Sequence, residues 1–144
     1  MIIACIQPKI HQSINRCYSE IEQILKILTD KVANIDIICL PERWVPLLND
    51  ISQNIQKERG ENYSFIKNLA GEYHINIISG AIWEKRENSR KPRITSYFIN
   101  EKGEEVGRQH KIHLYSYEQG QFEPGKELNL FSFNEYFFAI LICF

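Results

Sequence analysis

The segment from Ile35 to Leu40 is apolar at every position except Asp36, and Pro41 follows it directly. A strand with one face in water alternates apolar and polar residues, whereas this segment has consecutive apolar residues. It is therefore too apolar to be half-exposed, and we predict a central strand that is covered on both faces. Pro41 lacks the N–H that the next rung of a sheet would need, so the strand should end there.

The elements before this strand complete a βαβ unit. Ile2 to Ile6 form a short apolar run closed by Gln7-Pro8, which is typical of a buried strand entering a loop. Between the two strands, apolar residues recur at steps of three and four, so we predict a helix with Ser13 or Asn15 as its cap. The apolar stripe consists of Cys17, Ile21, Ile24, Leu25, Leu28 and Val32.

Further along the chain the alternation continues and then gives way to hairpins. A second helix is predicted around Phe65 to Tyr73 and a third strand from Ile75 to Trp83, which favours a layered α/β sheet. The polar, basic stretch from Glu84 to Arg93 is interpreted as a surface loop.

Two hairpins are predicted in the last third of the chain. Ile94 to Ile99 and Val106 to His110 flank a turn that contains Gly103. Leu128 to Phe133 and Tyr136 to Cys143 flank Asn134-Glu135. We find no repeat and no domain linker.

Composition excludes several function classes. The 144 residues carry 17 basic and 18 acidic side chains, a net charge of −1, so no global field attracts nucleic acid or an anionic membrane. No segment approaches the roughly 18 apolar residues that span a bilayer, and the N-terminus lacks the pattern of a signal peptide. The cysteines at 5, 17, 39 and 143 form no CxxC pair. We therefore expect a cytoplasmic protein with reduced thiols, without a zinc site or disulfide framework.

Three reactive side chains follow or lie within apolar or structured runs: Glu42 after Leu40-Pro41, Lys111 before Ile112-His113-Leu114, and Cys143 after Ile140-Leu141-Ile142. In open α/β sheets, sites form at the carboxyl ends of strands, which suits Glu42 and Cys143. Each residue alone has a structural explanation, because such a Glu is often a loop or capping residue and such a Cys is often part of the core.

The order, spacing and flanking residues of all three segments resemble the nitrilase superfamily of carbon–nitrogen hydrolases. The resemblance is richest around the lysine, where Gly103 to Arg108 leads into Lys111-Ile112-His113-Leu114-Tyr115, then Glu118, then Phe122 to Gly125. Two positions depart from the family pattern. Gln109-His110 stands where the family often has Tyr-Arg, and Ala139 stands where it often has Gly.

The resemblance implies a Glu-Lys-Cys catalytic triad of Glu42, Lys111 and Cys143. Cys143 would be the nucleophile, Glu42 the general base, and Lys111 with the backbone N–H of Phe144 the stabilising groups for developing negative charge. Glu118 would orient the lysine or the substrate. The implied activity is hydrolysis of a small amide, carbamoyl or nitrile compound through a Cys thioester, with no metal and no organic cofactor. His110 and His113 are not expected to bind a metal.

The resemblance also implies an α/β fold, the αββα sandwich of the family, whose members are about twice as long. We therefore expect residues 1–144 to form a partial carbon–nitrogen hydrolase domain that is truncated after the catalytic Cys strand. An alternative is an inactive truncated product, or a subunit that needs a partner chain to complete the fold. A third reading is a small ligand-binding α/β module. Expected partners are a small-molecule substrate and either further copies of the chain or a complementing chain, but no nucleic acid or membrane.

Overall fold

The computed structural model describes residues 1–143 and contains one main sheet and one small ribbon. The main sheet has seven strands in the order β1-β2-β4-β6-β5-β3, with β7 also paired to β6. Its strands are β1 (Ile3–Cys5), β2 (Ile37–Cys39), β3 (Gln56–Lys57), β4 (Asn76–Ile78), β5 (Ile82–Lys85), β6 (Arg93–Ile99) and β7 (Glu105–His110). The ribbon pairs β8 (Leu130–Phe133) with β9 (Tyr136–Ala139).

Strand β2 occupies the position that its sequence predicts. It pairs in parallel with β1 on one side and β4 on the other. Ile37 and Ile38 point to opposite faces and both are buried. Strand β6 then joins the sheet antiparallel to β4 and β5, and the β6–β7 hairpin turns through Gly103 at φ +74°. The sheet is therefore mixed: β1, β2 and β4 form a parallel half, β6 runs antiparallel to its neighbours β4, β5 and β7, and β3 is parallel to β5 at the far edge.

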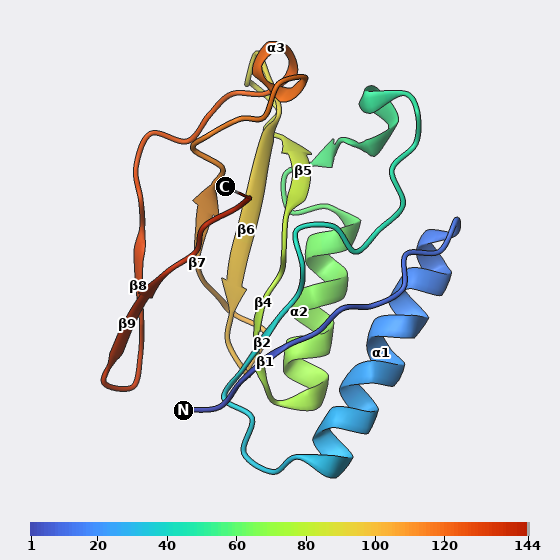
Figure 1. The fold of residues 1–144 in the computed structure, drawn as a ribbon. Coiled ribbons are helices and arrows are strands. Elements are labelled where there is room, and N and C mark those ends of the chain that lie inside the picture. The colour runs from blue at the N-terminus through green and yellow to red at the C-terminus, as the bar shows by residue number, and fades with distance from the viewer. Residues whose placement is uncertain (144) are drawn as a thin grey trace.

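The two long helices lie on one side of the main sheet and the β8–β9 ribbon lies on the other (Figure 1). The helices are α1 (Ile14–Lys31) and α2 (Glu61–Tyr73), with a short α3 (Glu118–Gln121) and a 3-10 turn at Ile51–Asn54. Within the described part of the chain, no helix is long and apolar enough to cross a membrane.

The core on the helix side is built by the predicted stripe of α1. Cys17, Ile21 and Leu25 are fully buried, whereas Val32 lies at the helix end and is exposed, so its place in the stripe was wrong. Ser13 is the N-cap residue, but its side chain makes no capping hydrogen bond. Trp44 completes this core and is fully buried.

The opposite face of the sheet is only partly covered. Phe98 and Ile37 of the main sheet pack against Phe131 of the ribbon, and these residues form a second apolar cluster. The outer side of the ribbon is open, with Phe137 78% and Leu130 73% exposed. The first face of the sheet thus has a closed core, and the second has an apolar surface in contact with solvent.

Three expectations about elements were wrong. The single strand predicted from Ile75 to Trp83 is two strands, because Gly80 at φ +65° breaks it and sends β5 to the far side of β6. The strand predicted to run from Tyr136 to Cys143 ends at Ala139. Glu84 is buried in β5 and not part of a surface loop.

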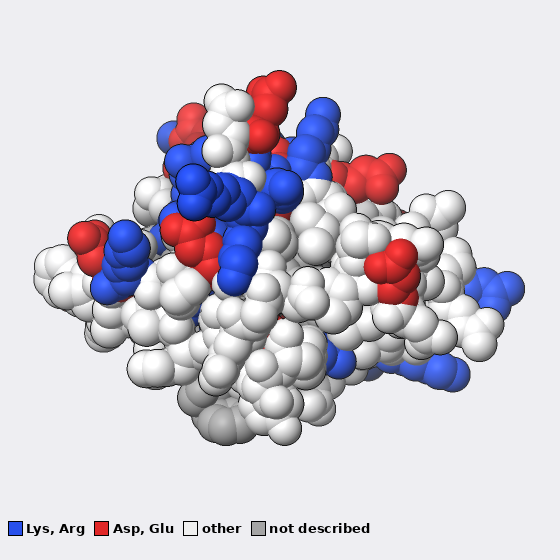
Figure 2. Space-filling model, turned by 90° about the horizontal axis from the view of Figure 1, so that it is seen from above, with Lys and Arg blue, Asp and Glu red and all other residues white. Residues whose placement is uncertain are grey.

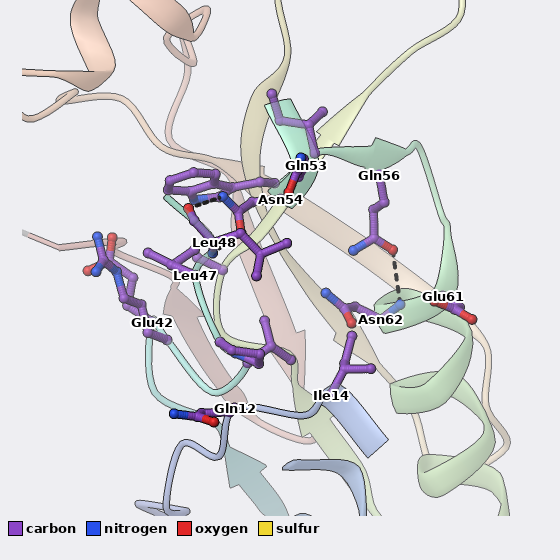
Figure 3. A pocket seen from close by; sticks show the side chains of 16 residues that line it. Gln12, Ile14, Glu42, Leu47, Leu48, Gln53, Asn54, Gln56, Glu61 and Asn62 are labelled. Atoms are coloured by element: carbon purple, nitrogen blue, oxygen red, sulfur yellow. Dashed lines mark hydrogen bonds between the residues drawn. The ribbon is translucent and has the colours of Figure 1, made fainter. Parts of the chain in front are cut away.

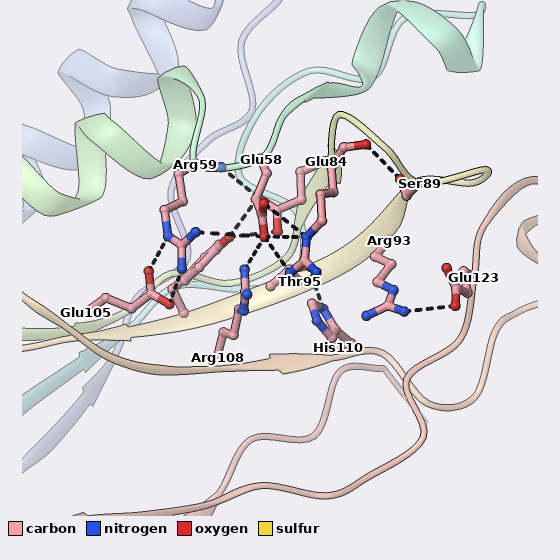
Figure 4. A network of polar contacts seen from close by, with 12 residues as sticks. Glu58, Arg59, Glu84, Ser89, Arg93, Thr95, Glu105, Arg108, His110 and Glu123 are labelled. Atoms are coloured by element: carbon pink, nitrogen blue, oxygen red, sulfur yellow. Dashed lines mark hydrogen bonds and ion pairs between the residues drawn. The ribbon is translucent and has the colours of Figure 1, made fainter.

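A network of ion pairs joins strand β5, the β6–β7 hairpin and the segment that enters α2 (Figure 4). Glu58 accepts hydrogen bonds from Arg86 and Arg108, and the Arg86 and Arg108 bonds help to lower the pKa of Glu58 to about 2. The hydroxyl of Tyr97 donates to both oxygens of Glu84, whose pKa is nevertheless raised because the carboxyl is buried. The network therefore contains both acidic and basic side chains.

His110 belongs to this network, and its ring Nδ1 lies 2.9 Å from Oγ1 of Thr95. Burial, and then the positive charges of Arg93, Arg108 and Arg86, lower the pKa of His110 to about 4. Figure 2 shows the molecule from above. Acidic and basic side chains gather together over one part of the visible face, and most of the rest of that face has no charged side chain. Such a surface has no single-sign field, as the net charge predicts.

Candidate functional site

Glu42 is held in place by the loops that follow β2 and β4. Gly80 lies against Pro41 so closely that a Cβ on Gly80 would be 2.1 Å from the Pro41 carbonyl oxygen. The N–H of Ala81 donates to the Glu42 carbonyl at 3.2 Å. The hydrogen bond and the close contact fix the backbone at Glu42 to the neighbouring loop. The Glu42 side chain is thereby held at the carboxyl end of the sheet.

Lys111 follows β7 and is anchored by its own N–H, which donates to the carbonyl of Ile94. Its side chain is buried, and the residue is 2% exposed. Its Nζ donates to Oε1 of Glu42 at 2.9 Å and to Oε1 of Glu118 at 3.0 Å. Burial alone would lower the pKa of Lys111, but the two hydrogen bonds outweigh burial and raise it. The lysine is therefore a buried cation held between two carboxylates.

Glu118 is the first residue of α3 and is 3% exposed. One carboxylate oxygen binds Lys111, and the other accepts the N–H of Tyr115 at 2.8 Å. These bonds hold the carboxylate in one orientation beneath the lysine. Glu118 is therefore buried and in contact with Lys111.

Cys143 follows β9 and lines a cavity of about 370 Å³ together with Glu42. Its backbone has φ +63°, in the left-handed region that a residue with a side chain seldom adopts. Backbones of this kind store strain and cluster at functional sites. Glu42 therefore connects the buried lysine to the cavity that the exposed Cys143 lines. The expected role of the Phe144 N–H falls outside the described residues.

A second cavity of about 340 Å³ adjoins the first, because Glu42 and Ala81 line both. Figure 3 shows its wall, where Leu47 and Leu48 face the amides of Asn54 and Gln56. Trp83 is also part of this wall. Each cavity is within the size range of pockets that bind small organic molecules.

Two features of the site were missed at the sequence level. The guanidinium of Arg43 donates to the hydroxyl of Tyr117 at 2.5 Å and so joins the loop of Glu42 to the loop of Glu118. Ser96 lines the Cys143 cavity from β6. Strand alternation could have placed Ser96 on the face of Phe98 and away from Tyr97, but it did not indicate which face carries the cavity.

Within residues 1–143, no group of three or more His, Cys, Asp or Glu side chains is arranged to hold a metal ion. His110 instead contacts Thr95 in the ion-pair network.

Comparison with known proteins finds matches along the whole chain. A family model described as carbon–nitrogen hydrolase matches residues 2–144. Over 84 residues the chain is 30% identical to the "Hydrolase in agr operon" of Staphylococcus aureus, a match that covers 57% of this chain and 31% of that protein. A protein of Schizosaccharomyces pombe described as a probable nitrilase is 29% identical over 84 residues, covering 58% and 31%.

Solved structures match the fold. Nit3 of Saccharomyces cerevisiae, a member of branch 10 of the nitrilase superfamily, superposes with a TM-score of 0.84 at 23% identity, covering 98% of this chain and 54% of that chain. An amidase from Nesterenkonia sp. superposes at 0.81 with 18% identity, covering 98% and 54%. The chain thus spans about half the length of these structures and has the fold of their matching halves.

Proposed function

Because the chain belongs to the carbon–nitrogen hydrolase family, we propose that its site hydrolyses the C–N bond of a small amide, carbamoyl or nitrile compound through a thioester on Cys143. The observation that carries this proposal is the position of Glu42. Its carboxylate binds the buried Lys111 at 2.9 Å and lines the same cavity as Cys143. Glu42 therefore links the proposed cation, Lys111, to the cavity that the proposed nucleophile lines.

In the proposed reaction with an amide, Glu42 takes the proton of the Cys143 thiol as the sulfur bonds to the carbonyl carbon. The C=O electron pair moves to oxygen, and the charge of Lys111 stabilises that oxygen. When the C=O bond re-forms, the C–N bond breaks and the nitrogen leaves with the proton held by Glu42. Water then attacks the thioester, gives its proton to Glu42, and releases the acid while the thiol is restored.

The Lys111–Glu118 pair supports the proposed role of Glu42. Lys111 donates a hydrogen bond to Glu42 at 2.9 Å and so holds its carboxylate at the cavity where the thiol proton would be accepted. Glu118 supplies the second negative charge, so that the lysine is fully paired before substrate arrives. We infer that Glu118 acts as a positioning residue and does not touch the substrate.

We also propose that the exposed apolar face of the ribbon is covered in the working protein by a second sheet, which would complete the αββα sandwich. Support comes from Phe137, Leu130 and Leu141, each more than 70% exposed. Apolar surface of this kind marks an association site. Further copies of the chain or a complementing chain could supply the layer, and size-exclusion chromatography distinguishes a monomer from either assembly.

The test of the function is mass spectrometry of the chain quenched during incubation with an amide such as butanamide, together with ammonia release. We expect an acyl adduct on Cys143 that is absent from Cys143→Ala. Cys5→Ala removes an exposed thiol and serves as the matched control, so it should keep both adduct and release. An adduct on Cys5, Cys17 or Cys39, or ammonia release by Cys143→Ala, would show that the nucleophile is wrongly assigned.

A further inference from the structure

The hydroxyl of Ser96 is buried without a hydrogen-bond partner. Ser96 is 1% exposed, and only its Oγ and Trp44 Nε1 lack a partner among the buried side-chain nitrogen and oxygen atoms of residues 1–143. Buried polar groups in native proteins are almost always hydrogen-bonded, so an exception calls for a missing partner such as a ligand. The two orphan atoms lie in different surroundings: Trp44 belongs to the core on the helix side, whereas Ser96 lines a cavity.

The position of Ser96 in β6 explains why no protein group reaches it. Successive side chains of a strand point to opposite faces. Thr95 and Tyr97 point toward the ion-pair network, where each has a partner in His110 and Glu84 respectively. Ser96 points the other way, into the cavity of about 370 Å³ that Glu42 and Cys143 also line.

The other side chains on this cavity wall cannot satisfy a neutral hydroxyl in their present positions. Apart from Glu42 and Ser96, the described lining residues are aliphatic or glycine, or carry the thiols of Cys39 and Cys143. By contrast, the buried hydroxyl of Ser79 donates to the carbonyl of Gly80 and accepts the N–H of Tyr97. Ser96 is therefore an unpaired hydroxyl on the wall of the cavity that the proposed nucleophile and base also line.

We propose that Ser96 is a substrate-binding residue whose hydroxyl hydrogen-bonds the uncharged carboxamide or nitrile group of the substrate between Glu42 and Cys143. This inference rests on the proposed function, because it uses the same cavity. A hydroxyl both donates and accepts, so it can bind either the carbonyl oxygen or an N–H of an amide. A buried site of this kind discriminates against ligands that leave the hydroxyl unpaired.

A binding role and a structural role predict opposite effects on stability. If Ser96 were structural, Ser96→Ala would remove a bond and lower the melting temperature. An unsatisfied buried hydroxyl destabilises the unliganded fold, so its removal should instead raise the melting temperature by ~3 °C. The same substitution should weaken ligand binding, because it removes the hydrogen bond that the ligand would make.

The experiment measures butanamide binding by NMR titration in the Cys143→Ala background, where no hydrolysis can occur. Adding Ser96→Ala should raise the Kd about fivefold to tenfold, in line with the loss of one neutral hydrogen bond. Ser96→Thr keeps a hydroxyl, so its Kd for butanamide should stay within about threefold of the parent's Kd. Thermal melting of this variant shows whether the fold accommodates the extra methyl group. Ser132→Ala, on an exposed position of β8, is the matched control and should leave the Kd unchanged.

Each outcome of the binding and melting experiments either supports or overturns the role of Ser96. A higher melting temperature with weaker butanamide binding in Ser96→Ala supports the inference. An unchanged Kd in that variant, or no saturable butanamide binding by the Ser96-containing parent, overturns it. A chain that binds butanamide through Ser96 but releases no ammonia when Cys143 is present supports the inference and contradicts the proposed function, so the two failures can be told apart.

Discussion

Replacing Lys111 with methionine removes the one cation between Glu42 and Glu118 while it keeps most of the side-chain volume. Lys111 and Glu118 are 2% and 3% exposed, and the Nζ–oxygen distances are 2.9 and 3.0 Å. The change leaves Glu118 as a buried carboxylate without its cation. Breaking a buried pair by removing one partner costs about 3–5 kcal/mol of folding stability, so we expect Lys111→Met to lose that amount at pH 8.

The pH dependence separates this cause from simple loss of packing. Without Lys111, burial and the nearby charge of Glu42 favour the protonated form of Glu118, so its pKa in the folded variant should lie above its value in the unfolded chain. The folded variant then binds more protons than the unfolded one, and its stability increases as the pH falls. In the native chain the raised pKa of Lys111 affects stability only above its usual pKa of 10.5, so it contributes no pH dependence between pH 5 and 8.

Urea denaturation at pH 5 and pH 8 measures the effect for the native chain, Lys111→Met, and Lys111→Met combined with Glu118→Gln. The single variant should be closer to native stability at pH 5, and the double variant should recover at least half of the loss at pH 8. Lys126→Met, at an exposed position, should change stability by less than about 0.5 kcal/mol. A loss below about 1 kcal/mol, or the same loss at both pH values, would refute the reasoning about a buried charge.

Two further predictions concern the backbone and the ion-pair network. Gly80→Ala adds a Cβ at positive φ and against the Pro41 carbonyl, so it should cost about 2–4 kcal/mol in chemical denaturation, while Gly120→Ala, with open space around it, should cost almost nothing. Because the pKa of His110 is lowered to about 4, the unfolded chain takes up its proton first as the pH falls from 6.5 toward 4, and stability should fall by ~1–2 kcal/mol. His110→Gln should abolish that part of the loss, and an identical pH profile in this variant would contradict the assignment.

The parallel half of the fold could be predicted from sequence because its signals are local. The apolar run at β2 spans a few residues, and the apolar stripe of α1 spans a few helical turns. The structure contains both elements. The break at Gly80 could not be predicted, because its cause is the close approach of Pro41, 39 positions earlier in the chain. Glu84 was assigned to the surface for the same reason: its burial depends on Tyr97 in another strand.

The candidate site, too, could be predicted only in part from the sequence. Glu42, Lys111 and Glu118 could be named from the family resemblance, but only the fold brings Lys111 to 3.0 Å from one carboxylate and 2.9 Å from the other. Ser96 carries no sequence signal, because a serine in a strand is ordinary. Its importance comes from the lack of a hydrogen-bond partner for its hydroxyl, and only the three-dimensional structure reveals that lack.

The contact between Lys111 and Glu42 joins residues 69 positions apart, and this separation bears on the order of folding. The β6–β7 hairpin closes over a few residues, whereas pairing β1, β2 and β4 requires long loops to close first. Local contacts form faster than distant ones because loop closure costs entropy. The hairpin should therefore form early, and the lysine should meet Glu42 only after the rate-limiting barrier. Defects at the site would then speed unfolding and leave the folding rate nearly unchanged.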